Sequence, residues 1–316
     1  MKSKEVSMKS VTILSTGSYL PKVKMENVAF AKALNVTEEY LIQRTGIRTR
    51  YFVKDETMCT MATKAAQKAI EKANIPIEEI DLIIVATTTT KQLMPGISYL
   101  VQKQLGIKQT MCLDILAGCS GYINAFDIAR NYIALGKVKI ALIIGVDILS
   151  QVIDKKDIGT AIVLSDGAGA TIIKAIGEEK RYESYLQSDG THSDILTYTA
   201  NSPLYMDGKA IYKYAVTETV KNVEQLLEKS KQSLEQIKYI IPHQSNLKIL
   251  KSIQSRLSIA EEKMYSNIET VGNTFCASIP IALDEMLDKQ LLHKGDKVIL
   301  LGYGGGLNTG SILLEI

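Results

Sequence analysis

The chain has 316 residues, of which 46% are hydrophobic and 22% are charged, and its formal net charge is +3. This composition supports a large buried core, excludes an intrinsically disordered protein, and is too balanced in charge to indicate a nucleic-acid-binding protein. No run of about 18 apolar residues occurs and the charged start lacks a signal peptide's apolar stretch, so we expect a cytoplasmic protein without a membrane contact.

Short apolar runs alternate with amphipathic stretches along the chain. The runs predict strands at residues 11–14, 82–86, 140–144, 161–164, 170–173, 239–241 and 298–301. Amphipathic periodicity predicts helices at residues 61–73, 99–105, 121–135, 211–230, 247–257 and 279–290. Because the strand runs are continuously apolar, as strands covered on both faces are, we expect α/β layers with mainly parallel strands.

The two halves of the chain echo each other. Residues 80–106 are similar in pattern to residues 237–258, and residues 119–145 are similar to residues 276–302. Both offsets are close to half the chain length, which predicts a duplicated α/β unit with a boundary near residues 177–181. The predicted halves are 1–177 and 178–316, and equivalent strand-to-helix turns at 117–121 and 273–280 should approach one another, as active-site turns of α/β sheets do.

Cys119 lies in the sequence AGCSGY, between an apolar run and an amphipathic stretch. Small residues there allow a sharp turn that places the thiol at a helix N-terminus, where the dipole and free amides favour an anion. We therefore expect a lowered pKa, a nucleophilic thiolate and a backbone amide that binds an oxyanion. The alternative is a packing role in a tight turn, and for Cys59, Cys112 and Cys276 we expect buried, reduced thiols.

Two polar residues of the second half are candidate partners of this thiol. His243 follows an apolar strand and opens a polar turn, whereas His192 and His293 lie in polar segments. Asn273 precedes a predicted helix in the turn that the duplication pairs with AGCSGY, and helix capping is its alternative role. A neutral His and an Asn can donate two hydrogen bonds to one oxygen, which suits an enolate left when a carboxylate departs as CO2. The sequence has no metal-ligand cluster.

Six motifs, in this order, resemble those of β-ketoacyl-acyl-carrier-protein (ACP) synthase III, an initiating condensing enzyme of the thiolase superfamily. They are QRTGIRTR at 43–50, AGCSGY at 117–122, SDGAGA at 165–170, PHQSN at 242–246, VGNT at 271–274 followed by ASIP, and GYGGGLNTGS at 302–311. The resemblance spans essentially the whole chain. It implies a thiolase-like fold of duplicated α/β/α/β/α layers with two pseudo-symmetric halves.

The resemblance implies a decarboxylative Claisen condensation. Cys119 takes an acyl group from a primer, acyl-CoA or acyl-ACP, and its backbone amide and that of Gly305 hold the oxyanion. His243 and Asn273 bind the thioester oxygen of malonyl-ACP while CO2 leaves, and the carbanion attacks the acyl-cysteine. The product is 3-oxoacyl-ACP, which begins fatty acid synthesis. No metal or cofactor is implied, because coenzyme A and phosphopantetheine thioesters are the substrates.

The resemblance also implies contacts with substrates and partners. Substrate-binding positions are Tyr40, Arg44, Met94, Leu164, Met206, Asn246, Phe275 and Tyr303. A basic patch of Lys213, Lys248, Lys251 and Arg256 is expected to receive the acidic acyl carrier protein, with an ordinary solvated face as the alternative. A homodimer is expected, because Met94 stands where a residue of the dimer partner closes the acyl pocket in the family.

The chain departs from the family at the coenzyme A site. Tyr40 replaces the usual Trp and Ile158 the usual Arg, which weakens adenine stacking and removes a cation near the phosphates. A carrier-bound primer is therefore an alternative to acyl-CoA. Leu164, Met94 and Phe275 change the acyl pocket in opposing directions, so its chain length stays open.

Two other functions are alternatives to the initiating condensing enzyme. One is a specialised acyltransferase or condensing enzyme of secondary metabolism with the same Cys-His-Asn site, and the other is a non-catalytic partner subunit. A Rossmann oxidoreductase is excluded, because no βαβ unit follows the glycine-rich residues 302–310. We expect that segment to bring backbone close to the thioester.

Overall fold

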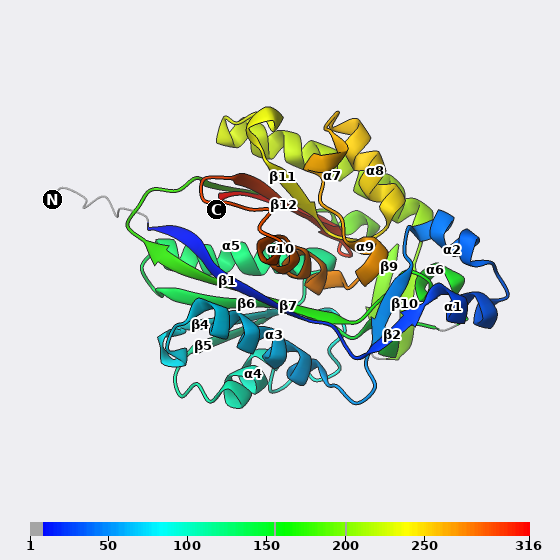
Figure 1. Ribbon diagram of the computed structural model, residues 1–316, viewed down its shortest axis with the longest axis horizontal. Coiled ribbons are helices and arrows are strands. Elements are labelled where there is room, and N and C mark those ends of the chain that lie inside the picture. Colours follow the sequence, from blue (N-terminus) through cyan, green and yellow to red (C-terminus); the bar gives the residue numbers. More distant parts are fainter. Residues whose placement is uncertain (1–8, 155, 200) are drawn as a thin grey trace.

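The computed structural model describes residues 9–154, 156–199 and 201–316. Two β-sheets alternate with three layers of helices, giving α/β/α/β/α (Figure 1). The first sheet has the order β1-β7-β6-β4-β5 and the second the order β11-β12-β13-β8. The strands are β1 (Ser10–Tyr19), β4 (Leu82–Ala86), β5 (Met111–Ile115), β6 (Ile140–Asp147), β7 (Gly167–Ile176), β8 (Tyr182–Ser188), β11 (Tyr239–Pro242), β12 (Lys297–Gly304) and β13 (Asn308–Glu315).

Three pairs of helices form the helical layers (Figure 1). The outer face of the first sheet is covered by α3 (Met58–Ala73) and α4 (Ile97–Leu105), and that of the second by α7 (Gly208–Ser230) and α8 (Leu247–Arg256). The central layer consists of α5 (Gly121–Ala134) and α10 (Ser278–Asp288). None of the helices in the described part of the chain is long and apolar enough to cross a membrane.

Smaller elements complete the fold, and many of them gather at one end of the layers (Figure 1). They are β2 (Val23–Glu26), α1 (Asn27–Leu34), α2 (Glu38–Thr45), β3 (Thr49–Phe52), α6 (Ile158–Ala161), β9 (Leu196–Thr199), β10 (Ser202–Met206) and α9 (Ile268–Val271). Single 3-10 turns are η1 (Ile77–Glu79), η2 (Gly118–Ser120), η3 (Leu149–Gln151), η4 (Gly190–His192), η5 (Leu234–Gln236), η6 (Glu261–Lys263) and η7 (Phe275–Ala277).

The core between the sheets explains why α5 and α10 are apolar on several faces. Ile84 and Ile143 of the first sheet and Leu300 and Ile312 of the second are fully buried in one cluster with these helices. Burying each such side chain contributes about 1.5–3 kcal/mol. Since this core is shared by both halves, the proposed separation at 177/178, in the loop between β7 and β8, stays a prediction.

The predicted duplication is visible in the strand register. Leu82 pairs with Ala141 in the first sheet, and Tyr239 pairs with Val298 in the second, both in parallel. The remaining neighbours follow the same order in both sheets, with β1-β7-β6-β4 matching β8-β13-β12-β11. The layered thiolase-like arrangement expected from the sequence is confirmed.

Two expectations about the strands are wrong. The sheets are mixed, because β7 runs antiparallel to β1 and β6, and β13 runs antiparallel to β12 and β8. The short β12–β13 turn forces antiparallel pairing, since parallel neighbours need a long crossover. Residues 161–164 are buried but continue the helical turn of α6, with the Leu164 N–H donating to the Thr160 carbonyl. Their apolar character reflects burial and not an extended backbone.

Candidate active site

Cys119 lies in η2, two residues before Gly121, the first residue of α5. The turn depends on Gly118, whose φ of 56° lies in the left-handed region that glycine adopts without strain. The thiol is only 4% exposed. The strand-to-helix turn predicted from AGCSGY is therefore present, with the cysteine at the start of a central helix.

The end of β12 approaches this turn very closely. A Cβ atom on Gly304 would lie 2.8 Å from the Cβ of Cys119 and 3.0 Å from its Sγ, so a side chain does not fit. The Asn308 side chain fastens the two segments, accepting from Ser120 Oγ at 2.6 Å and donating to the Ala117 carbonyl at 2.9 Å. The glycine-rich segment thus brings backbone to the thiol, as the sequence predicted.

The expected lowering of the Cys119 pKa is wrong. Burial raises the pKa of the thiol, and the negative charge of buried Asp147 acts in the same direction. The backbone N–H groups of Gly305 and of Cys119 itself lower it, but by less. Helix position alone does not set the protonation state, because removing a thiolate from water outweighs these dipoles. Burial therefore favours the protonated form of the Cys119 thiol.

His243 follows β11 and is also buried, with 2% exposure. Its backbone N–H donates to the Leu301 carbonyl at 2.7 Å, which ties it to β12. The imidazole ring meets the Tyr303 ring edge to face, with centroids 5.2 Å apart. Burial lowers the pKa of His243 from 6.5 to about 3, so the ring is neutral at physiological pH.

Asn273 lies next to the His243 turn. Its Nδ2 donates to the carbonyl of Ser245, two residues after His243, at 3.4 Å. Its Oδ1 accepts from the Phe275 backbone N–H at 3.0 Å, which fixes the orientation of the amide. Phe275 has a φ of 47°, a left-handed conformation that aromatic residues rarely adopt, and this turn directs its N–H back to Asn273.

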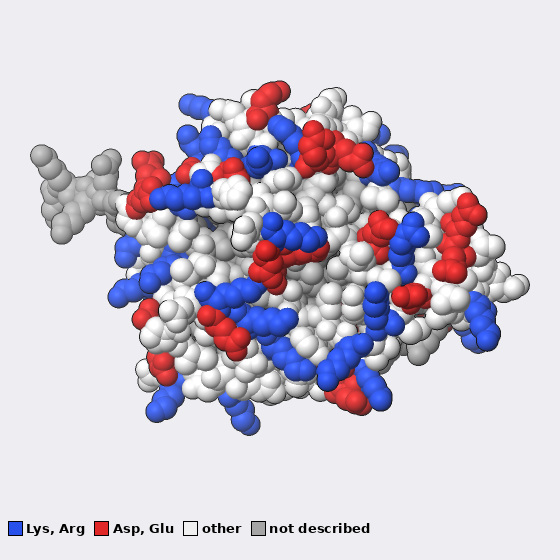
Figure 2. Space-filling model, viewed as in Figure 1, with Lys and Arg blue, Asp and Glu red and all other residues white. Residues whose placement is uncertain are grey.

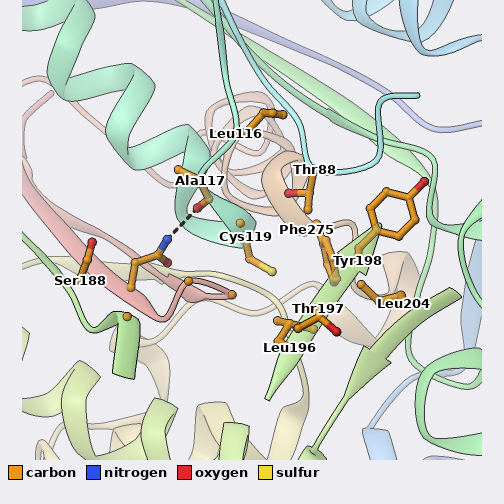
Figure 3. Close-up of a pocket in the computed structure, with 15 residues that line it drawn as sticks. Thr88, Leu116, Ala117, Cys119, Ser188, Leu196, Thr197, Tyr198, Leu204 and Phe275 are labelled. Atoms are coloured by element: carbon orange, nitrogen blue, oxygen red, sulfur yellow. Dashed lines mark hydrogen bonds between the residues drawn. The ribbon is translucent and has the colours of Figure 1, made fainter. Parts of the chain in front are cut away.

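A cavity of about 550 Å³ opens in front of Cys119. Figure 3 shows the Cys119 sulfur facing the side chains of Phe275 and Thr197 across this space. Other lining residues include Thr88, Leu116, Leu196, Tyr198, Leu204 and Gly305. The walls are largely apolar, so the cavity suits an acyl chain attached to the thiol.

The structure distributes the predicted substrate residues over several places. Only Phe275 lines the cavity. Leu164 is fully buried behind it and bridges to Asn273, while Tyr303 packs on His243. Met206 is half-buried at the end of β10, paired with the cavity residue Leu196.

A second group of predicted residues lies at the surface. Tyr40 and Arg44 are exposed on α2, one helical turn apart, and the side chain of Asn246 donates to the Arg44 carbonyl at 3.2 Å. Ile158 is 36% exposed. Met94 is 87% exposed in the loop between β4 and α4, outside the cavity lining.

The predicted carrier patch is exposed on the neighbouring helices α7 and α8. Lys213 lies on α7, and Lys248, Lys251 and Arg256 lie on α8. A hydrogen bond of 2.7 Å between Tyr212 and Ser252 joins the two helices. Figure 2 shows acidic and basic side chains interspersed across the face in view, so any attraction of an acidic partner depends on a local group of cations.

Sequence reasoning missed most of the cavity wall. Leu196, Thr197, Tyr198 and Leu204 come from the β9–β10 hairpin, whose short strands mix polar and apolar residues and gave no clear period. Asn308 carried a signal, because it lies within the motif at 302–311. No group of His, Cys, Asp or Glu able to hold a metal ion occurs in the part of the chain that the structure describes.

The layered fold and the buried cysteine at a central helix start define a thiolase-like protein. Residues 113–190 match the family described as 3-oxoacyl-[acyl-carrier-protein] synthase III, and residues 227–316 match its C-terminal part. A β-ketoacyl-[acyl-carrier-protein] synthase III of Clostridium kluyveri is 41% identical over 98% of this chain and 100% of the relative. A relative of the same name from Clostridium acetobutylicum is 38% identical, over 98% of this chain and 99% of the relative.

Solved structures agree with this relationship. The crystal structure of 3-oxoacyl-[acyl-carrier-protein] synthase III from Aquifex aeolicus superposes with a TM-score of 0.95 at 37% identity, covering 97% of this chain and all of that one. The chain belongs to the β-ketoacyl-ACP synthase III family. It is an acyl-transferring condensing enzyme.

Proposed function

We propose that this enzyme condenses an acyl primer thioester with malonyl-ACP, giving 3-oxoacyl-ACP and CO2 at the start of fatty acid synthesis. One observation carries the proposal. The Cys119 thiol faces an apolar cavity beside the Gly305 amide, and Asn273 donates to the Ser245 carbonyl in the turn that carries His243. Relatives named β-ketoacyl-[acyl-carrier-protein] synthase III match 98% of the chain, which supports the proposal.

The first half-reaction transfers the acyl group to the enzyme. The primer carbonyl oxygen accepts hydrogen bonds from the backbone N–H groups of Cys119 and Gly305 as the sulfur attacks. The carbon–sulfur bond to the primer's carrier breaks, and the proton of the Cys119 thiol leaves with the carrier thiol. Because burial raises the pKa of the thiol, this proton loss belongs to the acylation step itself.

The second half-reaction forms the carbon–carbon bond. Neutral His243 and Asn273 hydrogen-bond the thioester oxygen of malonyl-ACP while its carboxylate leaves as CO2. The enolate carbon then attacks the acyl carbonyl on Cys119, the sulfur departs, and one proton restores the thiol. A buried neutral imidazole suits this role, because it stabilises developing negative charge without a proton transfer.

The partners follow from the surface of the molecule. The exposed cations Lys213, Lys248, Lys251 and Arg256 would receive acyl carrier protein, with its phosphopantetheine arm entering beside Arg44 and Asn246. A homodimer would cover Met94, Leu93 and Leu116, which are 87%, 82% and 64% exposed near the edge strand β5. Leu116 lines the cavity, so a partner at this surface would help to close it.

A second candidate is a priming condensing enzyme of secondary metabolism. The priming β-ketosynthase of the R1128 polyketide pathway superposes with a TM-score of 0.93 at 28% identity, covering 98% of this chain and 97% of that one. The same catalytic residues would serve both functions. The identity of the primer and its carrier would separate them.

The deciding experiment exposes the purified protein to acyl-CoA and acyl-ACP primers and measures its intact mass. We expect a covalent adduct that is absent in Cys119→Ala, and release of CO2 from malonyl-ACP that is lost in His243→Ala and Asn273→Ala. If only acyl-ACP leaves an adduct, the primer is carrier-bound. Tyr40 and Ile158, which replace the usual Trp and Arg of the family, would then explain why acyl-CoA is not used. If neither an adduct nor CO2 appears, the proposal fails and a non-catalytic partner subunit takes its place.

A separate experiment tests the carrier patch. Lys248→Glu with Lys251→Glu should raise KM for malonyl-ACP about tenfold and leave cysteine acylation by acyl-CoA unchanged, because only the protein carrier reaches this surface. Lys103→Glu on α4 is the matched control, since this exposed lysine lies on the other outer layer. An equal effect of both changes would rule out α7 and α8 as the docking surface.

A further inference from the structure

Ser278 is the first residue of α10 and contacts the imidazole of His243. Its Oγ lies 2.7 Å from His243 Nδ1, and both residues are 2% exposed. The backbone of His243 is held by Leu301 and the ring by Tyr303, so the imidazole cannot turn easily. Nδ1 therefore meets a single side-chain partner, and the direction of that hydrogen bond decides where the ring carries its proton.

Gln244 settles the direction of this hydrogen bond. Its backbone N–H donates to Ser278 Oγ at 3.4 Å, and an N–H group can only donate. The serine hydroxyl has one proton to donate. Apart from the Gln244 N–H, its one hydrogen-bond partner among the described residues is Nδ1 of His243. If Nδ1 were protonated, the hydroxyl proton would be buried without an acceptor, which is strongly disfavoured.

We infer that Ser278 is a positioning residue whose hydroxyl donates to Nδ1 of His243 and thereby keeps the imidazole proton on Nε2. The Nε2–H group is then a hydrogen-bond donor on the ring edge opposite Ser278. This inference rests on the proposed function, in which His243 donates to the thioester oxygen of malonyl-ACP. Burial holds the pKa of His243 at about 3, so the ring remains a neutral donor with a fixed tautomer.

The hydrogen bond between Ser278 and His243 should affect decarboxylation and not acyl transfer. Acyl transfer uses Cys119 and the amides of η2 and the β12–β13 turn, whereas decarboxylation uses the donor edge of His243. Loss of the Ser278 hydroxyl should therefore separate the two steps. A residue that merely supported the fold would slow both steps together.

The first test measures the tautomer in the unmodified protein. The chain contains only three histidines, so labelling with 15N-histidine gives few side-chain signals, and His243→Asn identifies the one of interest. We expect the His243 signals of an Nε2–H tautomer, unchanged between about pH 6 and pH 8, an interval that includes the ordinary His pKa. A proton on Nδ1 would overturn the inference, and this measurement needs no variant of Ser278.

The second test compares three serine variants. Ser278→Ala should lower kcat for CO2 release from malonyl-ACP by about 10- to 100-fold, because the imidazole loses the hydrogen bond that orients it, with Cys119 acylation within about twofold. Ser278→Thr keeps the hydroxyl and should keep the Nε2–H signals. Ser230→Ala is the control, because it removes another buried serine hydroxyl, in the last turn of α7.

The outcomes separate the two proposals. If Ser278→Ala slows acylation and decarboxylation equally, or retains a pure Nε2–H tautomer, the positioning role is overturned. If the unmodified enzyme performs neither half-reaction, the proposed function fails instead. The tautomer of His243 is still measurable in that case and still decides the role of Ser278.

Discussion

The turns η2 and η7 are the same structure formed twice, but only the cysteine of η2 lines the cavity. Each precedes a central helix, and each carries a cysteine, Cys119 in the first and Cys276 in the second. Both thiols are buried, and burial raises the pKa of both. The Cys276 thiol donates a hydrogen bond to the Gly118 carbonyl at 3.0 Å, whereas Cys119 lines the cavity.

The difference arises at the strand end beside each turn. In the matching register, β6 ends in Asp147 and β12 ends in Gly304. The Asp147 carboxylate accepts a hydrogen bond from the Cys276 backbone N–H at 3.0 Å. This N–H group is therefore already paired, and the carboxylate occupies the space beside the Cys276 turn. Gly304 leaves room at Cys119 and lets the Gly305 amide reach the sulfur. The start of each central helix therefore forms the same backbone turn. The residue at the end of the neighbouring strand decides whether the thiol of that turn faces the cavity.

The largest expected effect compares the two cysteines directly. Cys119→Ala should reduce covalent acylation at least about 1,000-fold, because the proposed nucleophile is lost. Cys276→Ala should keep the rate within about fivefold, since this thiol is enclosed. Intact-mass measurement after primer addition distinguishes them. An adduct that survives in Cys119→Ala, or disappears in Cys276→Ala, would reverse the assignment.

Alkylation at different pH values sharpens the same comparison. Because the pKa of Cys119 is raised, its thiolate fraction should increase about tenfold per pH unit between pH 7 and pH 9, and so should its rate with iodoacetamide. Cys276 should stay unmodified in the folded enzyme, because it has no exposed surface. Peptide mass spectrometry reports both sites. If the alkylation rate of Cys119 did not increase with pH above pH 7, the pKa of this thiol would be lowered and not raised.

A side chain at Gly304 should abolish the contrast between the turns. Gly304→Ala places a methyl group against Cys119 and should lower the free energy of unfolding by about 1–3 kcal/mol, with loss of acylation. Gly177→Ala is the control, because nothing lies within 4 Å of the added atom there. Denaturant unfolding and intact mass measure the two effects. Equal stability of both variants would contradict the close approach of β12 to η2.

The last prediction concerns protonation, where burial raises the pKa of the thiol and lowers that of the imidazole. His243 has a pKa of about 3 in the folded enzyme against 6.5 ordinarily, so the unfolded chain binds the extra proton between these values. Stability contributed by neutral His243 is present above pH 6.5 and lost as pH falls, by up to about 1.4 kcal/mol per unit.

Unfolding curves at several pH values test this slope. His243→Asn should flatten the dependence of unfolding free energy on pH between about 6.5 and 4, while exposed His293→Asn should leave it unchanged. The slope is compared within each variant, so a general loss of stability does not matter. An unchanged slope in His243→Asn would show that other groups control acid sensitivity.

Local sequence patterns predicted those elements in which the side chains are buried in one regular way from end to end. The strand at residues 82–86 agrees with β4 because all five side chains are buried. Helices α3 and α7 begin three residues earlier than predicted, since Thr57 and Asp207 cap them with their side chains. The hairpin β9–β10 was missed because its four- and five-residue strands lie half in the cavity wall.

The sequence by itself determined the duplicated layers and the strand-to-helix turn that carries Cys119, because motif order and periodicity are properties of the chain. Tertiary structure decided the direction of the thiol pKa, the apolar cavity and the partner of the His243 ring. Each of these depends on atoms from segments far apart in sequence, such as Ser278 beside His243. Desolvation and hydrogen-bond direction exist only after those segments have packed together.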